Sequence, residues 1–289
     1  MSGEEHGRAT IATITGTTEH TAYLGIDVGG TKTLLASLDE HGVITQEIKF
    51  PTPQDYQEFL RQLADNLAKL GTHSFRSGAI GIPGVIDHRY GIGRSFSHLA
   101  WQDVAVQSDV EKITGCPMAL ENDAKLAGLS ESMLVKDKRK VLYVTVSTGI
   151  GSGFIVDQHI DPELAGNEVG HILLEHHGKY QRWEDFAAGS AIVRQFGKPM
   201  SDIDDEATLK TVARNIALGL IDLTAVLTPD IIVIGGSVGT HFHKYGEHLA
   251  RYMNVFDNPM IQLPVIQPAQ RPEKAVVYGC YDLAKQIYG

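Results

Sequence analysis

Short runs of apolar residues recur along the chain, and several of them end at glycine or proline. Such runs are typical of strands buried within a sheet. In the first half of the chain the predicted strands cover residues 23–28, 34–38, 43–50, 79–82 and 118–120. In the second half they cover residues 141–146, 154–156 and 231–234.

Apolar side chains three or four residues apart predict amphipathic helices between these strands. This spacing occurs over residues 56–70 and 209–223, and a further helix is expected over residues 104–114. Strands and helices therefore alternate along the chain, which favours an α/β fold.

The same order of elements occurs twice. Residues 23–38 and residues 141–156 each contain an apolar strand, a loop rich in glycine and threonine, and a second strand. Duplicated α/β halves of this kind place a ligand cleft between them. No low-complexity linker separates the halves, so we expect a short hinge.

Length and charge narrow the class of protein. The 289 residues suffice for two domains or one large domain, and a hydrophobic content of 43% is typical of globular chains. The formal net charge of −10 argues against nucleic-acid binding, which needs clustered lysine and arginine. No apolar run approaches the ~18 residues that span a bilayer, so no membrane association is expected.

The N-terminal sequence and the cysteine content indicate the cellular compartment of the protein. Residues 1–22 lack the apolar centre of a secretory signal and are expected to form a flexible tail. Cys116 and Cys280 are the only cysteines, which excludes a disulfide framework and a thiolate metal site. His176 and His177 lack metal-ligand spacing and are expected at the surface. Together these features predict a cytoplasmic enzyme that acts on a small molecule.

A glycine-rich loop follows the first predicted strand. Gly29 and Gly30 let the backbone approach a ligand closely, and Thr31 and Lys32 suit a phosphate group. Asp27, at the end of the strand, is a candidate ligand for hydrated Mg²⁺. The next element is a strand instead of a helix, which excludes a Walker phosphate loop. A tight hairpin turn is the alternative interpretation.

Two further glycine loops also lie at the ends of predicted strands. One contains Thr148, Gly149 and Gly151, and the other contains Gly235 and Gly236. Neither matches the dinucleotide-binding pattern of glycines. Each loop alone is a weak signal, but three loops at strand ends predict a nucleotide held between the two halves.

Five polar residues are candidates for substrate chemistry. Asp123 follows a predicted strand and could accept a proton from a substrate hydroxyl, whereas Asn122 or Asp123 could instead cap the next helix. Glu168 and His171 would share one face if their segment is helical, and the pair suits vicinal hydroxyls. A histidine buried in the core is the alternative for His171. The sequence pattern alone assigns no role to Glu184.

Taken together, these motifs resemble the ROK family of sugar kinases (repressor, open reading frame, kinase), within the actin-like ATPase superfamily. The resemblance covers nearly the whole chain from residue 23 onward. The matching blocks are residues 27–32, 81–84, 121–124, 148–153, 168–171 and 234–236. It implies the two-domain actin-like ATPase (ribonuclease H-like) fold, of class α/β, with a cleft between the domains. We expect a smaller domain of residues 23–121 plus 276–289 and a larger domain of residues 122–275.

The resemblance further implies a homodimeric kinase that uses ATP and Mg²⁺ to phosphorylate a hexose, with the 6-hydroxyl of glucose or a close hexose as acceptor. Asp123 matches the family's catalytic base. The positions that match sugar contacts are Gly84, Asn122, Asp123, Glu168, His171 and Glu184. The positions that match phosphate and adenosine segments are Gly29, Gly30, Thr31, Lys32, Thr148, Gly149, Gly151, Gly235 and Gly236.

Two departures from the family pattern affect the prediction. Family members usually carry zinc on the histidine matching His171 and on three following cysteines, which this chain lacks, so no zinc is expected. The family's asparagine four residues before Trp101 is absent, and Ser97 or His98 would have to replace it. Zinc-free relatives include polyphosphate-dependent glucokinases and glucomannokinases, so polyphosphate is an alternative donor. A non-catalytic sugar-sensing protein is the other alternative.

Overall fold

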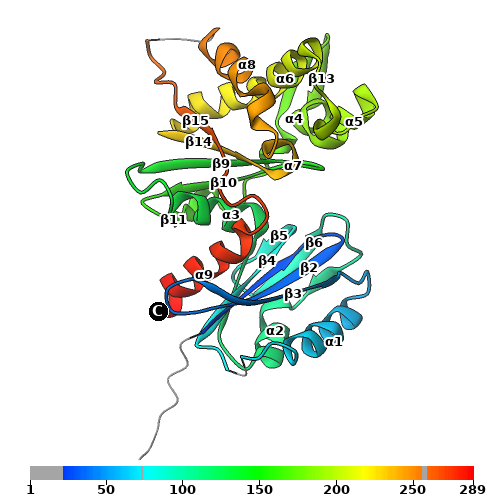
Figure 1. Ribbon diagram of the computed structural model, residues 1–289, viewed down its shortest axis with the longest axis vertical. Helices are drawn as coiled ribbons and strands as arrows, with labels where there is room; N and C mark the ends of the chain where they lie inside the picture. The colour runs from blue at the N-terminus through cyan, green and yellow to red at the C-terminus, as the bar shows by residue number, and fades with distance from the viewer. Residues whose placement is uncertain (1–21, 73, 256–258) are drawn as a thin grey trace, which may run out of the picture.

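The computed structural model describes residues 22–72, 74–255 and 259–289. Figure 1 shows two groups of strands and helices, one above the other, with helix α9 (Ala275–Tyr288) between them. Apart from Ala22, the predicted flexible tail lies outside the described residues. Among the described residues, no helix combines the length and the apolar character that crossing a membrane requires.

The first sheet has the strand order β3-β2-β1-β4-β8. Its strands are β1 (Tyr23–Val28), β2 (Lys32–Leu38), β3 (Ile44–Pro51), β4 (Ser77–Ile82) and β8 (Met118–Asn122). β1 and β2 form an antiparallel hairpin, whereas β1, β4 and β8 run parallel. The carboxyl ends of the parallel strands therefore lie along one edge, which is where ligands bind in open α/β sheets.

The second sheet repeats this pattern, in the order β11-β10-β9-β14-β15. Its strands are β9 (Lys140–Val146), β10 (Ile150–Val156), β11 (His159–Ile160), β14 (Ile231–Gly235) and β15 (Val265–Pro268). Again the first two strands form an antiparallel hairpin, and β9, β14 and β15 run parallel. The duplication predicted from the sequence is confirmed.

Amphipathic helices bury their apolar faces against the two sheets. Helices α1 (Tyr56–Leu67) and α2 (Val106–Thr114) pack through Phe59, Leu63 and Val110 on the first sheet. On the second sheet the packed helices are α4 (Trp183–Ala187), α5 (Gly189–Phe196), α6 (Glu206–Leu227), α7 (Gly236–Gly239) and α8 (Phe242–Val255). Each sheet therefore has a hydrophobic core of its own.

Helices α3 (Asp123–Ser132) and α9 lie between the sheets and cross each other closely (Figure 1). A Cβ at Gly279 of α9 would lie 2.0 Å from the carbonyl oxygen of Leu126 in α3, so this crossing requires glycine. On its other side α3 contacts the second sheet, because a Cβ at Gly153 would lie 2.9 Å from the Cα of Lys125. The N-terminus of α3 is thereby held between the two sheets.

Short elements complete the fold, and their brevity gives little hydrophobic periodicity from which to predict them. A small antiparallel sheet contains β5 (Gly84–Asp87), β6 (Ile92–Phe96) and β7 (Gln102–Val104). A hairpin contains β12 (Leu173–His176) and β13 (Lys179–Arg182). The 3-10 turns are η1 (Pro162–Leu164), η2 (Val169–His171) and η3 (Met200–Asp202).

Two local expectations need correction. The helix expected over residues 104–114 is confirmed, but it begins at Val106, because the preceding residues pair with β6 as strand β7. Glu168 and His171 do not share a face of an α-helix, since Glu168 precedes a single 3-10 turn that ends at His171.

Candidate active site

Asp27 and Asp123 approach each other from different elements. Asp27 lies near the end of β1 and pairs with Gly81 of β4, whereas Asp123 is the first residue of α3. A Cβ at Gly81 would lie 3.7 Å from the Cα of Asp123. A Cβ at Gly151 would lie 3.2 Å from the Cβ of Ala124, so β10 packs against the same turn. Motifs from both halves of the chain therefore meet at Asp123.

Burial raises the pKa of both carboxyl groups. It raises the pKa of Asp27 to about 7, with a further contribution from the charge of Asp123 and an opposing one from Lys49. It raises the pKa of Asp123 to about 6, opposed by the hydrogen bond from the Ala124 N–H and supported by the charge of Glu168. Carboxyl groups titrating near neutral pH are typical of general bases and cation sites.

Asn122 is the N-cap of α3. Its side-chain oxygen accepts the backbone N–H of Ala124 at 3.0 Å, so the capping role expected for this residue is confirmed. The side-chain nitrogen of Asn122 lies 3.4 Å from the carbonyl oxygen of Gly84. Cap and strand β5 together orient the start of α3, where Asp123 lies.

The buried carboxylate of Glu121 hydrogen-bonds to the backbone just before helix α3. Glu121 Oε1 accepts the backbone N–H of Asn122 at 2.7 Å, and Glu121 Oε2 lies 3.1 Å from Nε2 of His88. This hydrogen bond raises the pKa of His88 above its ordinary value. His88 follows strand β5, and nothing in the local sequence singles it out, because its partner is 33 residues away.

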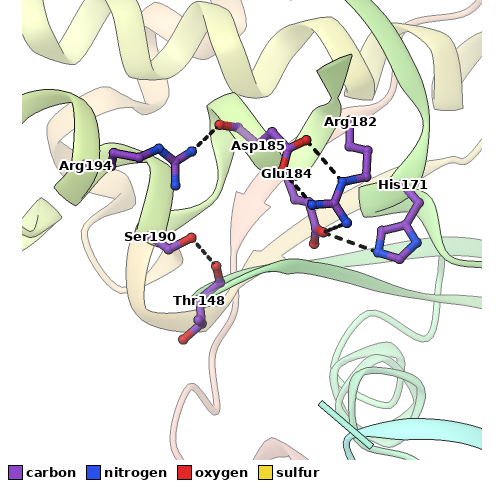
Figure 2. A network of polar contacts seen from close by, with 7 residues as sticks. All are labelled: Thr148, His171, Arg182, Glu184, Asp185, Ser190 and Arg194. Carbon is purple, nitrogen blue, oxygen red and sulfur yellow. Dashed lines mark hydrogen bonds and ion pairs between the residues drawn. The ribbon is translucent and has the colours of Figure 1, made fainter. Parts of the chain in front are cut away.

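Glu184 and His171 come together in a polar network (Figure 2). Nε2 of His171 lies 3.2 Å from Oε1 of Glu184, and Nη1 of Arg182 lies 3.2 Å from the same oxygen. The Glu184 side chain is 20% exposed and that of His171 is 56% exposed, so His171 is not a histidine of the core. Glu168 is also exposed, and its charge acts on Asp123.

The other carboxylate oxygen of Glu184 occupies a slot between two glycines. A Cβ at Gly149 would lie 2.9 Å from Oε2 of Glu184, and a Cβ at Gly170 would lie 3.1 Å from it. Gly149 belongs to the loop between β9 and β10, and Gly170 belongs to turn η2. Glu184 therefore joins the second glycine loop to the Glu168–His171 segment.

A cavity of about 290 Å³ lies beside the second sheet, close to the lower limit of small-molecule sites. Its lining includes the polar residues Thr148, Ser190 and Ser237 together with Met200 and His241. Ser190 Oγ donates to the carbonyl oxygen of Thr148 at 2.6 Å, as Figure 2 shows. The cavity offers hydroxyl groups beside an apolar surface, a combination that suits a nucleoside.

The third glycine loop runs into this cavity. Gly236 has a φ of +79°, and a Cβ there would lie 2.5 Å from the carbonyl oxygen of Val146. A Cβ at Gly235 would lie 2.1 Å from the hydroxyl of Tyr143. Only glycine fits this close turn, and it leads directly to Ser237 in the cavity wall.

The first glycine loop is a tight turn between β1 and β2. The Gly29 N–H donates to the carbonyl oxygen of Lys32 at 3.0 Å, which confirms the hairpin-turn interpretation. Thr31 and Lys32 are exposed. A Cβ at Gly30 would lie 2.9 Å from the Cβ of His98, so the loop that contains His98 lies over this turn.

Of the two histidines expected at the surface, His177 is exposed, but His176 is only partly so. The His176 ring stacks on Phe186 with centroids 4.1 Å apart, and its Nε2 lies 3.3 Å from Oδ1 of Asn215. Asn215 also donates to the carbonyl oxygen of Phe186, and its own carbonyl oxygen accepts from the indole of Trp183. This network fixes α4, the helix that carries Glu184.

The donor set at Asp27 and Asp123 fits Mg²⁺. Mg²⁺ takes oxygen ligands, keeps several waters and uses one or two carboxylates. The charge of Asp123 raises the cost of ionising Asp27, and a bound cation would relieve it. Among the described residues, no group of three or more His, Cys, Asp or Glu side chains is arranged to hold a metal by itself.

Comparison with known proteins identifies the family and several relatives of this chain. The model of the ROK family matches residues 23–287. A putative fructokinase of Bacillus subtilis is 29% identical over 74% of this chain and 76% of its own length. A glucokinase of Streptomyces coelicolor is 26% identical over 74% of this chain and 81% of its own. A ROK glucokinase from Streptomyces griseus, solved with glucose and AMPPNP, superposes with a TM-score of 0.77 at 24% identity, covering 92% of this chain and 99% of that one.

Proposed function

This chain belongs to the ROK family and has its actin-like ATPase fold, and we propose that it is an ATP- and Mg²⁺-dependent hexose kinase. The acceptor in this proposal is the 6-hydroxyl of glucose or of a closely related hexose. Relatives named glucokinase and fructokinase support the reaction class. The observation that carries the proposal for this chain is the partly buried Asp123 carboxyl at the point where both halves meet, and its raised pKa of about 6 suits a general base at neutral pH.

Asp123 accepts the proton in the proposed reaction. As the hydroxyl oxygen of the sugar attacks the terminal phosphorus in line, its proton passes to the Asp123 carboxylate. The bond between that phosphorus and the bridging oxygen breaks, and ADP leaves. The hydrogen bond from the Ala124 N–H at 2.8 Å fixes one carboxylate oxygen, so the side chain is oriented before the sugar binds.

The glycine loops face the donor in this proposal. Their backbone N–H groups, with Thr31 and Lys32, would bind the phosphates, and the cavity beside Thr148 and Ser237 would take the adenosine. Asp27 is the residue that would hold Mg²⁺. That ion neutralises charge on the donor phosphates when bound.

The sugar contacts in this proposal are Asn122, Glu168, His171 and Glu184, with the Gly84 strand beside them. Carboxylate and imidazole groups hydrogen-bond to neighbouring hydroxyls, and a substrate that lacks a matching hydroxyl leaves such groups unpaired. Discrimination among hexoses can then reach ~10⁴-fold. Ser97 and His98 face the first glycine loop and are the further candidates for sugar selection.

The proposal is tested by measuring ADP formation with Mg-ATP and a panel of glucose, mannose, fructose, allose, N-acetylglucosamine and N-acetylmannosamine. Asp123→Asn serves as the blank. Turnover that depends on one sugar and disappears in the variant would support the hexose kinase and identify its acceptor. Turnover with polyphosphate but not with ATP would show that polyphosphate is the phosphoryl donor. Sugar binding by calorimetry without turnover on either donor would overturn the kinase in favour of a sensor.

A further inference from the structure

Each guanidinium nitrogen of Arg182 contacts a carboxylate oxygen. Its Nε and Nη2 bind Asp185 Oδ2 and Oδ1 at 3.1 and 2.8 Å, which is a two-point contact. Its remaining nitrogen, Nη1, lies 3.2 Å from Oε1 of Glu184. Figure 2 shows the side chain lying between the two acidic residues. Because each of its three nitrogens contacts a carboxylate oxygen of this chain, Arg182 is placed to orient these two acidic side chains.

The backbone around Arg182 is anchored on both sides. Arg182 is the last residue of β13 and pairs with Leu173 of β12. The next residue, Trp183, is fully buried, and its backbone N–H donates to the carbonyl oxygen of Ile172 at 2.8 Å. Asp185 is held in turn, because its carbonyl oxygen accepts from Nη2 of Arg194. The guanidinium is therefore fixed relative to the β12–β13 hairpin and to α4.

One carboxylate oxygen of Glu184 is constrained by side-chain nitrogens, and the other is constrained by the backbone of two glycines. Oε1 is shared by Arg182 and His171, and Oε2 lies in the slot between Gly149 and Gly170. His171 is more exposed than Arg182, at 56% against 47%, and makes a single contact with Glu184. Arg182, oriented by Asp185, is the stiffer of the two supports.

We propose that Arg182 is a positioning residue that holds the Glu184 carboxylate in the slot between the donor-side loop and the sugar-side turn, and thereby sets the affinity for the sugar. The inference rests on the proposed function, in which Glu184 contacts the acceptor. Arg182 acts through Glu184 and touches neither the sugar nor the phosphates. Lysine cannot replace it, because an ammonium group lacks the planar fork that reaches Asp185 and Glu184 together.

A double-mutant cycle on KM tests the proposal with Arg182→Lys, Glu184→Gln and the double variant. Arg182→Lys is expected to raise KM for the sugar at least ~5-fold, with kcat and KM for ATP within about twofold of wild type. In the Glu184→Gln background the same change is expected to alter KM for the sugar by less than about twofold. A purely structural role would instead lower the melting temperature and leave KM unchanged.

Arg139→Lys is the matched control, because Arg139 is also an exposed arginine paired with an aspartate, Asp157, at 3.2 Å. It is expected to leave KM for the sugar unchanged. If the wild-type enzyme is active and the fold-changes in KM of Arg182→Lys and Glu184→Gln simply multiply in the double variant, Arg182 does not act through Glu184. That result would overturn this inference and leave the proposed function intact. A wild-type protein that neither binds nor phosphorylates any sugar of the panel would overturn the proposed function, and this inference with it.

Discussion

Asp27 and Asp123 lie close enough that the charge of Asp123 adds to burial in raising the pKa of Asp27 to about 7. The two residues are 96 positions apart in the printed chain, and the pairing of β1, β4 and β8 brings them to one edge of the first sheet. Asp123 also experiences the charge of Glu168 from the second half. Three carboxylates from separate segments thus share one electrostatic environment.

Asp123→Asn is expected to lower kcat by ~10²–10⁴-fold while leaving the sugar dissociation constant within a few-fold. The amide keeps the shape of the side chain but cannot accept the proton of the hydroxyl. Steady-state kinetics and calorimetry measure the two quantities separately. Wild-type turnover in the variant would remove Asp123 from its role as base.

The pH profile of kcat is expected to rise with pH through about 6 and then level off. The base must be ionised to accept a proton, and burial raises the pKa of Asp123 to about 6, so protonation removes activity below that pH. Glu168→Gln removes a charge that contributes to this shift and is expected to move the acidic limb to lower pH. Glu163→Gln, at an exposed site of turn η1, is the control. An acidic limb unaffected by Glu168→Gln would contradict the coupling.

Gly149→Ala is expected to raise KM for the sugar about tenfold with little loss of stability. The new Cβ would lie 2.9 Å from Oε2 of Glu184 and would expel the carboxylate from its slot. Gly166→Ala is the control, since a Cβ at Gly166 meets no described atom within 4 Å. Kinetics and thermal melting of both variants check the prediction, and an unchanged KM in Gly149→Ala would contradict the slot.

Asp282→Asn is expected to stabilise the protein at neutral pH. Burial raises the pKa of Asp282 to about 6, and its Oδ2 finds no hydrogen-bond partner among the described residues. Because the folded pKa exceeds the ordinary 3.8, the folded state binds the proton more tightly, and stability falls as pH rises from about 4 through 6. The amide avoids this loss, which is on the order of 3 kcal/mol for a pKa raised from 3.8 to about 6.

Denaturant unfolding at pH 7.5 and pH 4 separates that effect from a general change in packing. The gain of Asp282→Asn is expected at pH 7.5 and is expected to be mostly lost at pH 4, where the folded carboxyl is neutral and the unfolded one, with its ordinary pKa of 3.8, is only about half ionised. Asp222→Asn, at an exposed position of α6, supplies the control. An equal gain at both pH values would show that ionisation of Asp282 is not the cause.

Much of the framework could be predicted from the sequence by itself. Short apolar runs predicted β1, β4, β9 and β14, because buried strands need continuous hydrophobic side chains. The repeated strand–loop–strand pattern predicted the duplication of the two sheets. A helix cap at Asn122 or Asp123 was predictable from residue type, since capping is a local interaction, and the structure shows that Asn122 is the cap.

Tertiary structure alone decided which of these residues meet. Glu184 lies between Gly149 and Gly170, and Glu121 lies beside His88, through contacts that link separate strands and turns. Arg182 had no sequence signal at all, because an exposed arginine beside acidic residues is common and only the anchored β13 gives it a fixed position. Periodicity reports the face that a residue occupies within its own element. The pKa of Asp123 and the support of Glu184 depend on the packing of different elements against one another, which a local pattern does not encode.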